Sequence, residues 1–534
     1  MTSPRWNPPV ALSTREARVY GRVAKKRKLF SFLRDHRHEL FDEEFQVELE
    51  QMYRPSGAGK EPVPPALMAM VLLLQCYSQA SDAEAVELAV CDLRWQLVLG
   101  CLGSEDAPFS QGALYDFRQR FIEHDMDRKL LERTRELAKR TGAFDFKKLP
   151  KKLDVAVDSS PLTGAGRVED TFNLLAHAAY KVLLCVSQMR GVPAELLVDE
   201  LGIPLLGESS IKKALDIDWS DDAAKTVALN LLLQQIEALE SWVRTNLERE
   251  ANVDPLLEQL ALLGQLREQD LEPEPDGGGG GSRITRGVAK DRRVSIEDPD
   301  MRHGRKTRTK TFNGYRRHVV IDLKTKLILA VVIASGNERE KDGLTPLLER
   351  MNHQGLELAS IYFDRGYIES EEVPKLIAAN VEVVCKPWHQ QNGDKFNKRD
   401  FDVDLVKERV TCPAGQKQPL VLGQITRFEP KTCNACKLKE QCTTSELGRS
   451  LRISLNEPLQ AELRARQATV EGRAQLRRRV PVEHTLAHVS QRQGNRARYL
   501  GKRKNEYDLS RTATVVNLQI VQRGLEGRRL AIAA

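Results

Sequence analysis

The chain has 534 residues, which is too long for one compact core, so about two to four domains are expected. Its 82 Lys and Arg and 75 Asp and Glu residues leave a net charge of +7. The basic residues gather in blocks, which suit a polyanionic partner as well as a solvated surface. No charged segment followed by an apolar one opens the chain, and the longest apolar run, Ala66–Cys76, is too short to span a bilayer. We therefore expect a soluble intracellular protein, not a membrane or secreted one.

Residues 1–150 are expected to be helical, with helices over 29–40, 65–77, 83–92 and 110–121. Ser81 and Glu84 have the spacing of a capping box at the start of the third helix. The fourth helix carries Arg118 and Arg120 away from its apolar face, which suits a helix-turn-helix that reads a DNA groove. An ordinary helical bundle would give the same pattern.

A strand over 152–158 is expected next, ended by Ser, Pro and Gly. Asp154 and Asp158 have the same parity, so they face the same side of this strand, with Asp158 at its carboxyl end. Helical patterns then cover 172–186, 194–201 and 223–249, and a flexible Gly-rich linker follows at 272–282. We interpret residues 165–300 as a helical insertion.

The central part of the chain predicts a hairpin over 312–323 and 326–334, with Asp322 as a structural residue at its turn, and a helix over 343–352. Leu358–Phe363 predicts a buried strand, followed by Asp364 and by Gly366, which can take the positive φ of a tight exit. A helix over 369–379 and a strand over 381–386 come next. An acid at the carboxyl end of a strand is where α/β sheets place catalytic groups, although Asp364 could instead only cap the turn.

Residues 387–455 differ in character because four of the nine cysteines cluster there. Cys433 and Cys436 form a C-x-x-C pair, and Cys412 and Cys442 flank it at irregular spacings. This set of thiols predicts a structural tetrahedral Zn²⁺ site, with free reduced thiols as the alternative. The other five stand singly in apolar surroundings and are expected to be buried thiols: Cys76, Cys91, Cys101, Cys185 and Cys385.

The last part of the chain is helical and basic, with helices over 459–475, interrupted at Gly472, and over 509–521. Between them, Pro481 suits the start of a helix whose first turn contains Glu483. Glu483 could be no more than a favourable charge at a helix N-terminus. Basic blocks surround it, as a site that closes on a DNA backbone would require.

Asp158, Asp364 and Glu483 together predict metal-dependent phosphodiester chemistry. That chemistry uses two divalent cations, one that activates the attacking oxygen and one that stabilises the leaving oxygen. Mg²⁺ or Mn²⁺ binds carboxylates, water and substrate phosphate, so three acids at the ends of rigid elements suffice to hold the pair. Asp154 is the substitute if Asp158 is not the first ligand.

The ordered set of segments resembles the bacterial insertion-sequence transposases of the DDE class. The resemblance rests on the stretch from Tyr53-Arg-Pro-Ser to Phe117-Arg-Gln-Arg and on five later blocks: Val157–Gly164, Asn313–His318, Tyr362–Tyr367, Thr411–Gly415 and Arg479–Glu483. The cysteine-rich piece is similar to that of one subgroup. The resemblance implies an α/β fold with an RNase H-like mixed sheet core, a helical N-terminal domain, a helical insertion and a small cysteine-rich, zinc-ribbon-like insertion.

On this basis the chain divides into a helical N-terminal DNA-binding domain (1–150), a first core strand (151–164), the helical insertion and linker (165–300), the continued core (301–386), the cysteine-rich insertion (387–455) and the last core helices (456–525). The resemblance implies a DNA transposase that cuts strands at the ends of its element and joins them to target DNA. Asp158, Asp364 and Glu483 would be its metal ligands.

Arg479 matches the arginine that related transposases carry four residues before the glutamate. Leu476 and Ser490 stand where a tyrosine and a lysine would be, so Arg492 or His484 would have to compensate. Contacts to DNA are expected from Arg118, Arg120, Arg479 and Arg492. Trp388 would join them if it stacks on a flipped base instead of packing in a core.

The implied partners are double-stranded DNA, as terminal inverted repeats and as target, and a second copy of the chain in a homodimeric complex. The implied location is the bacterial cytoplasm, at the nucleoid. Two other functions remain open: a DNA-binding relative without catalysis, such as an immobilised relic or a domesticated transposase, and a generic metal-dependent nuclease of the same fold.

Overall fold

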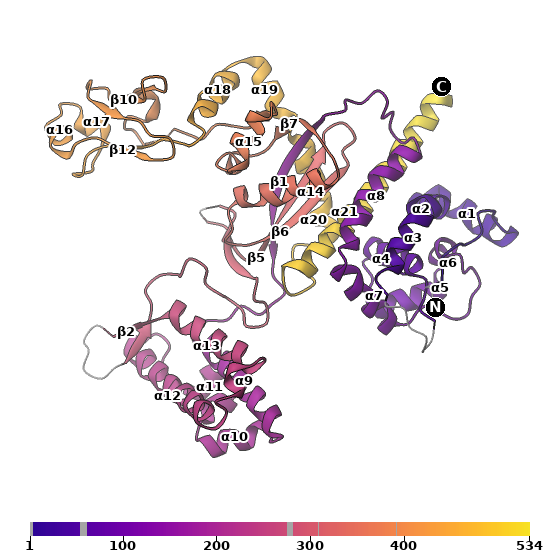
Figure 1. Ribbon diagram of the computed structural model, residues 1–534, viewed down its shortest axis with the longest axis horizontal. Helices are drawn as coiled ribbons and strands as arrows, with labels where there is room; N and C mark the ends of the chain where they lie inside the picture. The colour runs from indigo at the N-terminus through magenta and orange to yellow at the C-terminus, as the bar shows by residue number, and fades with distance from the viewer. Residues whose placement is uncertain (1–3, 54–60, 275–280, 308, 391, 534) are drawn as a thin grey trace.

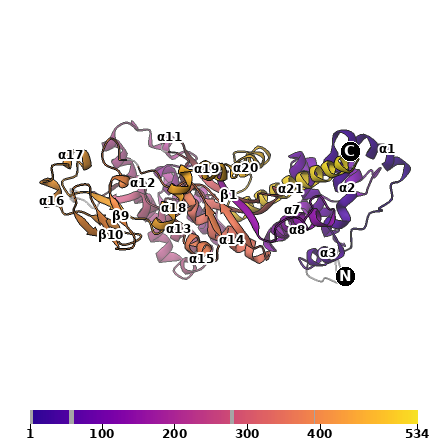
Figure 2. The ribbon, with the colours of Figure 1, turned by 90° about the horizontal axis from the view of Figure 1, so that it is seen from above.

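The computed structural model describes residues 4–53, 61–274, 281–307, 309–390 and 392–533. The sequence Tyr53-Arg-Pro-Ser-Gly-Ala-Gly predicts a break in the helical pattern, and residues 54–60, like most of the predicted Gly-rich linker, lie outside the described residues. The molecule is elongated, with the N-terminal helices at one end and the cysteine-rich lobe at the other (Figures 1 and 2). A mixed sheet lies between them.

The central sheet contains β1 (Leu153–Thr163), β4 (Arg302–Arg305), β5 (Thr311–Asp322), β6 (Ile328–Ser335), β7 (Leu358–Tyr362) and β8 (Glu382–Val384). The strand order is β4-β5-β1-β7-β8, and β6 also pairs with β5. β5 is antiparallel to β1, β4 and β6, whereas β1, β7 and β8 are mutually parallel neighbours. Nearly every residue of β5 and β6 is buried, because helices cover both faces of the sheet. This architecture confirms the predicted mixed α/β fold class with a helical N-terminal region.

β1 is longer than predicted, and Asp158 does not end it. The strand continues to Thr163, which pairs with Gly314 of β5. On its other side, β1 pairs with β7 only as far as Ala156, opposite Tyr362. Past that point β5 is its only named strand neighbour among the described residues, so Pro161 is tolerated without a donor for a second ladder. Asp158 therefore lies inside β1 but beyond the end of the parallel pair.

The two faces of the sheet bury alternate residues of each strand. Val155 and Val157 of β1 pack in one cluster, together with residues of α14 (Leu344–His353), α15 (Glu372–Ala378) and α18 (Glu457–Ala468). Ala156 faces the opposite cluster, together with residues of α20 (Val480–Gln493) and α21 (Lys502–Ala533). Because side chains alternate along a strand, Asp154 and Asp158 belong to the α20 side, as their shared parity predicts.

The N-terminal region is helical, as predicted: α1 (Thr14–Lys26), α2 (Lys28–Leu40), α3 (Glu43–Glu50), α4 (Pro65–Ser78), α5 (Asp82–Cys91), α6 (Leu93–Leu99), α7 (Gln111–Glu123) and α8 (Met126–Arg140). α4 is apolar all round and is buried by its neighbours. The capping box at Ser81 and the cap at Ser110 both form. The C-terminal α21 packs against α4, α8 and β6, so one long helix joins this region to the sheet (Figure 1).

The insertion after β1 is a separate helical body with its own core, seen at the lower left of Figure 1. It contains α9 (Thr171–Arg190), α10 (Ala194–Leu201), α11 (Ile211–Leu215), α12 (Asp222–Asn246) and α13 (Leu256–Asp270), with the short 3₁₀ helices η1 (Pro204–Gly207) and η2 (Glu250–Asn252). The short strands β2 (Leu271–Pro273) and β3 (Ser282–Ile284) pair at the two sides of the Gly-rich stretch. The apolar stripe of α12 is core, as its helical spacing predicts.

The cysteine-rich lobe has two small sheets and two short helices: β9 (Asp402–Asp404), β10 (Arg409–Thr411), β11 (Lys417–Pro419), β12 (Ile425–Arg427), β13 (Ser450–Arg452), α16 (Pro430–Asn434) and α17 (Lys439–Cys442). After it come α18 and α19 (Val470–Arg477). The break between them falls at Thr469, whose side chain caps α19, and not at the predicted Gly472. A hydroxyl that caps a new helix sets this boundary, whereas Gly472 continues the helix.

Two further expectations are wrong. Cys91 is exposed and Cys101 and Cys185 are partly exposed, because only Cys76 and Cys385 of the five single cysteines point into a core. Gly366 does not take a positive φ; it lies in the short 3₁₀ helix η4 (Arg365–Tyr367). In the part of the chain that the structure describes, no helix combines the length and apolar character needed to cross a bilayer.

Candidate active site

The three predicted acids lie on three different elements of the core. Asp158 is in β1, opposite Val319 of β5. Asp364 follows β7 directly and caps η4, where its Oδ1 accepts a hydrogen bond from the N–H of Arg365 at 2.8 Å. Glu483 lies in the first turn of α20, with half of its side chain exposed. The capping contact expected as the alternative role of Asp364 therefore forms.

Arg479 connects two of these acids. Its Nη2 donates to Glu483 Oε1 at 2.6 Å, one helical turn away, and its Nη1 lies 3.4 Å from Asp158 Oδ1. Nη1 is buried and has no hydrogen-bond partner among the described residues. The guanidinium therefore supplies positive charge between Asp158 and Glu483 without satisfying all of its own donors.

The pKa of Asp158 is raised above that of an ordinary aspartate. Burial is the largest cause and raises this pKa, because a charged carboxylate loses solvation. The positive charge of Arg479 and the N–H of Ser159 oppose the rise, and the charges of Glu483 and Asp364 add to it. The charges of both acids thus act on Asp158, and Arg479 pairs with two of the three carboxylates, so the three acids form one electrostatic cluster.

The donor chemistry of this cluster fits Mg²⁺ or Mn²⁺, since three carboxylates offer hard oxygen ligands. Within the described residues, however, no three His, Cys, Asp or Glu side chains stand close enough together to hold an ion. A cation of the protein itself, Arg479, lies between two of the acids instead. The arrangement thus matches the ligand type for a divalent ion but not yet its coordination distances.

Asp154, the substitute ligand, has other partners. Ser360 of β7 donates to its Oδ1 at 2.6 Å, and Arg478 lies 3.0 Å from its Oδ2. Arg478 also stacks on the ring of Tyr362. Arg478, just before α20, thus holds the start of that helix against the sheet. Asp154 therefore has a structural role.

Sequence reasoning missed Glu340, which lies beside this cluster in the 3₁₀ helix η3 (Glu340–Gly343). Its Oε1 accepts from the hydroxyl of Ser159, the residue after Asp158, at 2.9 Å and lies 3.2 Å from Nη1 of the buried Arg316. A Cβ at Gly366 would overlap its carboxylate. Burial, then the charges of Glu340 and Asp158, raise the pKa of Tyr367.

Glu340 therefore connects the strand that carries Asp158 with the turn that carries Asp364. This contact explains why Gly366 is a glycine without a positive φ: the space for a side chain is already occupied. The available signal in the sequence was the acid-rich segment Asn337–Asp342 after the hairpin, which resembles an ordinary solvated loop.

The residues predicted to contact DNA differ in whether their side chains are already engaged by other residues. Arg118 is a correction: it is only 5% exposed, and it forms an ion pair with Asp82 of α5, so its guanidinium is not free for a phosphate. Arg120 stacks on Tyr53, and Arg492 stacks on Tyr77 and donates to its carbonyl at 3.2 Å. The spacing along α7 could not reveal the partners of Arg118 and Arg120, because Asp82 and Tyr53 lie outside that helix.

Trp388, unlike Arg118, is exposed. It is 41% exposed, although a tryptophan more commonly packs in a core. His389 beside it is also exposed. Arg473 and Arg477 of α19, in the basic run before Glu483, are also exposed.

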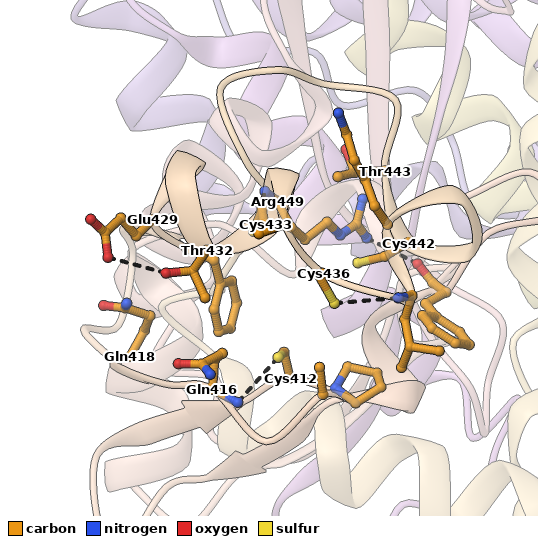
Figure 3. Close-up of a pocket in the computed structure, with 17 residues that line it drawn as sticks. Cys412, Gln416, Gln418, Glu429, Thr432, Cys433, Cys436, Cys442, Thr443 and Arg449 are labelled. Carbon is orange, nitrogen blue, oxygen red and sulfur yellow. Dashed lines mark hydrogen bonds between the residues drawn. The ribbon is translucent and has the colours of Figure 1, made fainter.

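The four clustered cysteines come together in the lobe, where Cys412, Cys433, Cys436 and Cys442 line one cavity (Figure 3). None is in a disulfide. Burial raises the pKa of the Cys442 thiol, and the neighbouring thiols Cys433, Cys412 and Cys436 raise it further. His389 does not line this cavity.

Comparison with protein-family models gives two matches. Residues 411–521 match the model described as "Transposase DDE domain", and residues 22–120 match the model described as "Transposase domain (DUF772)". The first includes Glu483 and the four clustered cysteines, and the second covers most of the N-terminal helices. Asp158 and Asp364 lie outside both matches. No curated protein and no solved structure matches the chain.

Proposed function

We propose that this chain, which belongs to the insertion-sequence transposases of the DDE class, cleaves DNA strands at the ends of its element and transfers them to target DNA. The proposal is supported by the contacts of Arg479 with Asp158 of β1 and with Glu483 of α20, and by the position of Asp364 just after β7, the parallel neighbour of β1. Each acid sits on a rigid element, so the scaffold can fix their spacing.

Asp158, Asp364 and Glu483 would hold the metal ions in this function. The chemistry that bound Mg²⁺ or Mn²⁺ supplies is activation of the attacking water or DNA 3′-hydroxyl and stabilisation of charge on the leaving oxygen. The protein's own part is to hold the three carboxylates on one side of the core, although burial, and then the charges of Glu483 and Asp364, raise the pKa of Asp158.

Arg479 offsets the mutual repulsion of two of these carboxylates. Its guanidinium offsets the charge of Asp158 and Glu483 and holds Glu483 one turn along α20. Loading the site requires the guanidinium to release at least one acid. An arginine released next to the cluster is well placed to bind a DNA phosphate bidentately.

Replacing Arg479 with alanine is therefore expected to lower strand cleavage by about 100-fold, the scale seen when one charge-stabilising donor is lost. Since two like charges would then face each other unpaired, half-maximal cleavage should also require a different Mg²⁺ concentration. Cleavage rates across a Mg²⁺ titration would measure both effects.

Arg478→Ala is the matched control, because Arg478 is the neighbouring arginine and pairs with Asp154 instead. It should leave the Mg²⁺ dependence unchanged. Equal losses in the two variants would argue that general positive charge matters and that the position of Arg479 does not.

Replacing Glu340 with alanine should lower cleavage by about tenfold, the scale of losing a group that orients ligands. The hydroxyl of Ser159 and Nη1 of the buried Arg316 would both lose this acceptor, so the strand that carries Asp158 would lose its contacts with η3. The Glu340→Gln variant should recover much of the rate, because an amide oxygen still accepts from Ser159.

Glu338→Ala is the control for Glu340, since Glu338 contacts the backbone of Ser335 and Lys502 away from the acids. Mg²⁺ titrations should show a shifted midpoint for Glu340→Ala only. An unshifted midpoint with a lowered melting temperature would mean that Glu340 serves stability alone.

DNA contact at the core would follow the exposed basic run of α19 and the exposed Trp388. The arginines supply phosphate contacts, whose strength falls with salt, and an exposed tryptophan offers a stacking surface for an unpaired base. The N-terminal helices would provide further contacts through exposed side chains of α7, in place of the buried Arg118.

A cleavage assay tests the whole proposal. Full-length protein is incubated with DNA that carries the ends of the flanking element, in Mg²⁺ or in EDTA, and products are resolved on a denaturing gel. Mg²⁺-dependent cuts at the ends support the transposase. Binding without cuts would favour a DNA-binding relative without catalysis, and cuts without end preference or strand transfer would favour a generic nuclease.

Two ends must be joined in one reaction, so we also propose that the active complex contains two copies of the chain. Analytical ultracentrifugation with and without end DNA measures this directly. Assembly of two chains with two DNA ends is the expected result, and a complex with a single chain that still cleaves would contradict it.

A further inference from the structure

The cysteine-rich lobe has little apolar core of its own. Its buried cluster consists of Phe401, Val410, Leu420, Phe428, Leu451 and Ile453, with partly buried cysteines packed against it. Its strands are three residues long and its helices four or five. Small units of this kind usually need a disulfide or a metal ion to remain folded. All four thiols are free, so a disulfide does not supply this.

The four thiols surround one cavity of about 360 Å³. Cys412, which follows β10, lies on one side of the cavity, and Cys433, Cys436 and Cys442 from the α16–α17 segment lie on the other (Figure 3). The sulfurs thus come from two separate parts of the lobe. A ligand between them would join the β10 turn to the two helices.

Backbone N–H groups point at three of the four sulfurs. Gln416 donates to Cys412 at 3.3 Å, Leu438 to Cys436 at 3.4 Å and Arg449 to Cys433 at 3.5 Å. A neutral thiol is a weak acceptor, and hydrogen bonds to sulfur are most useful where the sulfur is a thiolate bound to a metal. These N–H groups would form an outer shell around the sulfurs if a metal ion were bound to them as thiolates.

Positive side chains also line the cavity. Arg449 is fixed there by its hydrogen bond to the Phe396 carbonyl at 3.1 Å and by stacking on Phe401, and Lys439 lies nearby. Four thiolates around one divalent ion carry a net charge of −2, which these cations would offset. Free, neutral thiols would need no such charges.

We propose that Cys412, Cys433, Cys436 and Cys442 bind one Zn²⁺ ion as a closed structural site. Four sulfur ligands around a tetrahedral ion leave no position for water, so the ion would stabilise the fold without acting in catalysis. As the side chains stand, no three His, Cys, Asp or Glu in the described parts of the chain are close enough to hold an ion. Binding therefore requires the thiols to turn into the cavity that they already line.

The lobe is coupled to the element that leads to Glu483. Lys398 forms an ion pair with the buried Glu457 at the start of α18, and the N–H of Trp388 donates to Gln460 of the same helix at 2.9 Å. Asn456 donates to the carbonyl of Ile368, next to the Asp364 turn, at 2.7 Å. A lobe folded by zinc would thus support the position of α18 on the core.

The test measures metal and not transposition. Full-length protein purified without chelators is expected to contain about one equivalent of zinc. An organomercurial that titrates thiols should release this zinc, as detected with a chromogenic chelator. Protein refolded with Co²⁺ should show the thiolate charge-transfer and tetrahedral d–d absorption of a four-sulfur site.

Cys433→Ser and Cys436→Ser should each lose the zinc, and limited proteolysis should then cut within residues 387–455. Cys91→Ser is the matched control, because Cys91 is an exposed single cysteine outside the lobe. It should keep the metal. Wild-type protein without zinc and without a cobalt–thiolate spectrum would overturn the proposal, and so would zinc retained by both lobe variants.

Discussion

Replacing Asp364 with asparagine is expected to lower metal-dependent strand cleavage by about 1,000-fold or more, the scale of removing a group that acts as one unit with others in an active site. Asparagine has nearly the same size, and it caps a turn as well as aspartate does, so the hydrogen bond from Arg365 should persist. It lacks the negative charge that a hard divalent cation requires. The variant thus separates the capping role of Asp364 from a metal-binding role.

Denaturing gels of end-DNA cleavage give the rate, gel-shift assays give DNA binding, and circular dichroism gives the fold. Binding and fold should be unchanged in Asp364→Asn. Cleavage at the wild-type rate would show that Asp364 is only a cap and would remove it from the site.

Asp158→Asn and Asp154→Asn form a matched pair on one face of β1. Asp158 is in the electrostatic cluster with Asp364 and Glu483, whereas Asp154 is paired with Arg478 and Ser360. Loss of cleavage in the first variant alone is expected. The reverse pattern would move the first metal ligand to Asp154.

Asn517→Ala is expected to have the second large effect, a decrease of about 3 kcal/mol in the free energy of unfolding. Asn517 is fully buried on α21 and binds both backbone groups of Ile328, accepting from its N–H and donating to its carbonyl, each at 2.8 Å. It also donates to Thr134 of α8 at 2.8 Å. Alanine would leave these buried groups without partners.

Gln519→Ala on the same helix is the control, because Gln519 is partly exposed and accepts only a long hydrogen bond from Arg492. Denaturant unfolding of both variants measures the difference. Since α21 joins the N-terminal helices to β6, we also expect Asn517→Ala to expose β6 to hydrogen exchange. Equal stabilities of the two variants would mean that the Asn517 bridge contributes little.

Some of the fold could be predicted from local signals. α4 and α10, the hairpin of β5 and β6, and the strand before Asp364 all appear where apolar periodicity indicates them. Capping residues fixed the starts of α5 and α7. Asp322 accepts from the N–H groups of Lys324 and Thr325, which is the structural role expected for an acid at a hairpin turn.

Other features depend on partners that are distant in sequence. β1 continues past Asp158 because β5 continues beside it, and Gly366 is constrained by Glu340 from another segment. Arg118 looks like a surface arginine on its own helix but is taken by Asp82 of α5. Trp388 remains exposed although its residue type favours a core.

The sequence by itself determined the residue types of the candidate site, three acids at element ends and four clustered cysteines, because local periodicity and spacing are properties of the chain. Only the tertiary structure decided which of these groups lie next to one another. It placed Arg479 between Asp158 and Glu483, Glu340 between the Asp158 strand and the Asp364 turn, and the four thiols around one cavity. Proximity between distant segments follows from sheet order and helix packing, which no short stretch of sequence encodes.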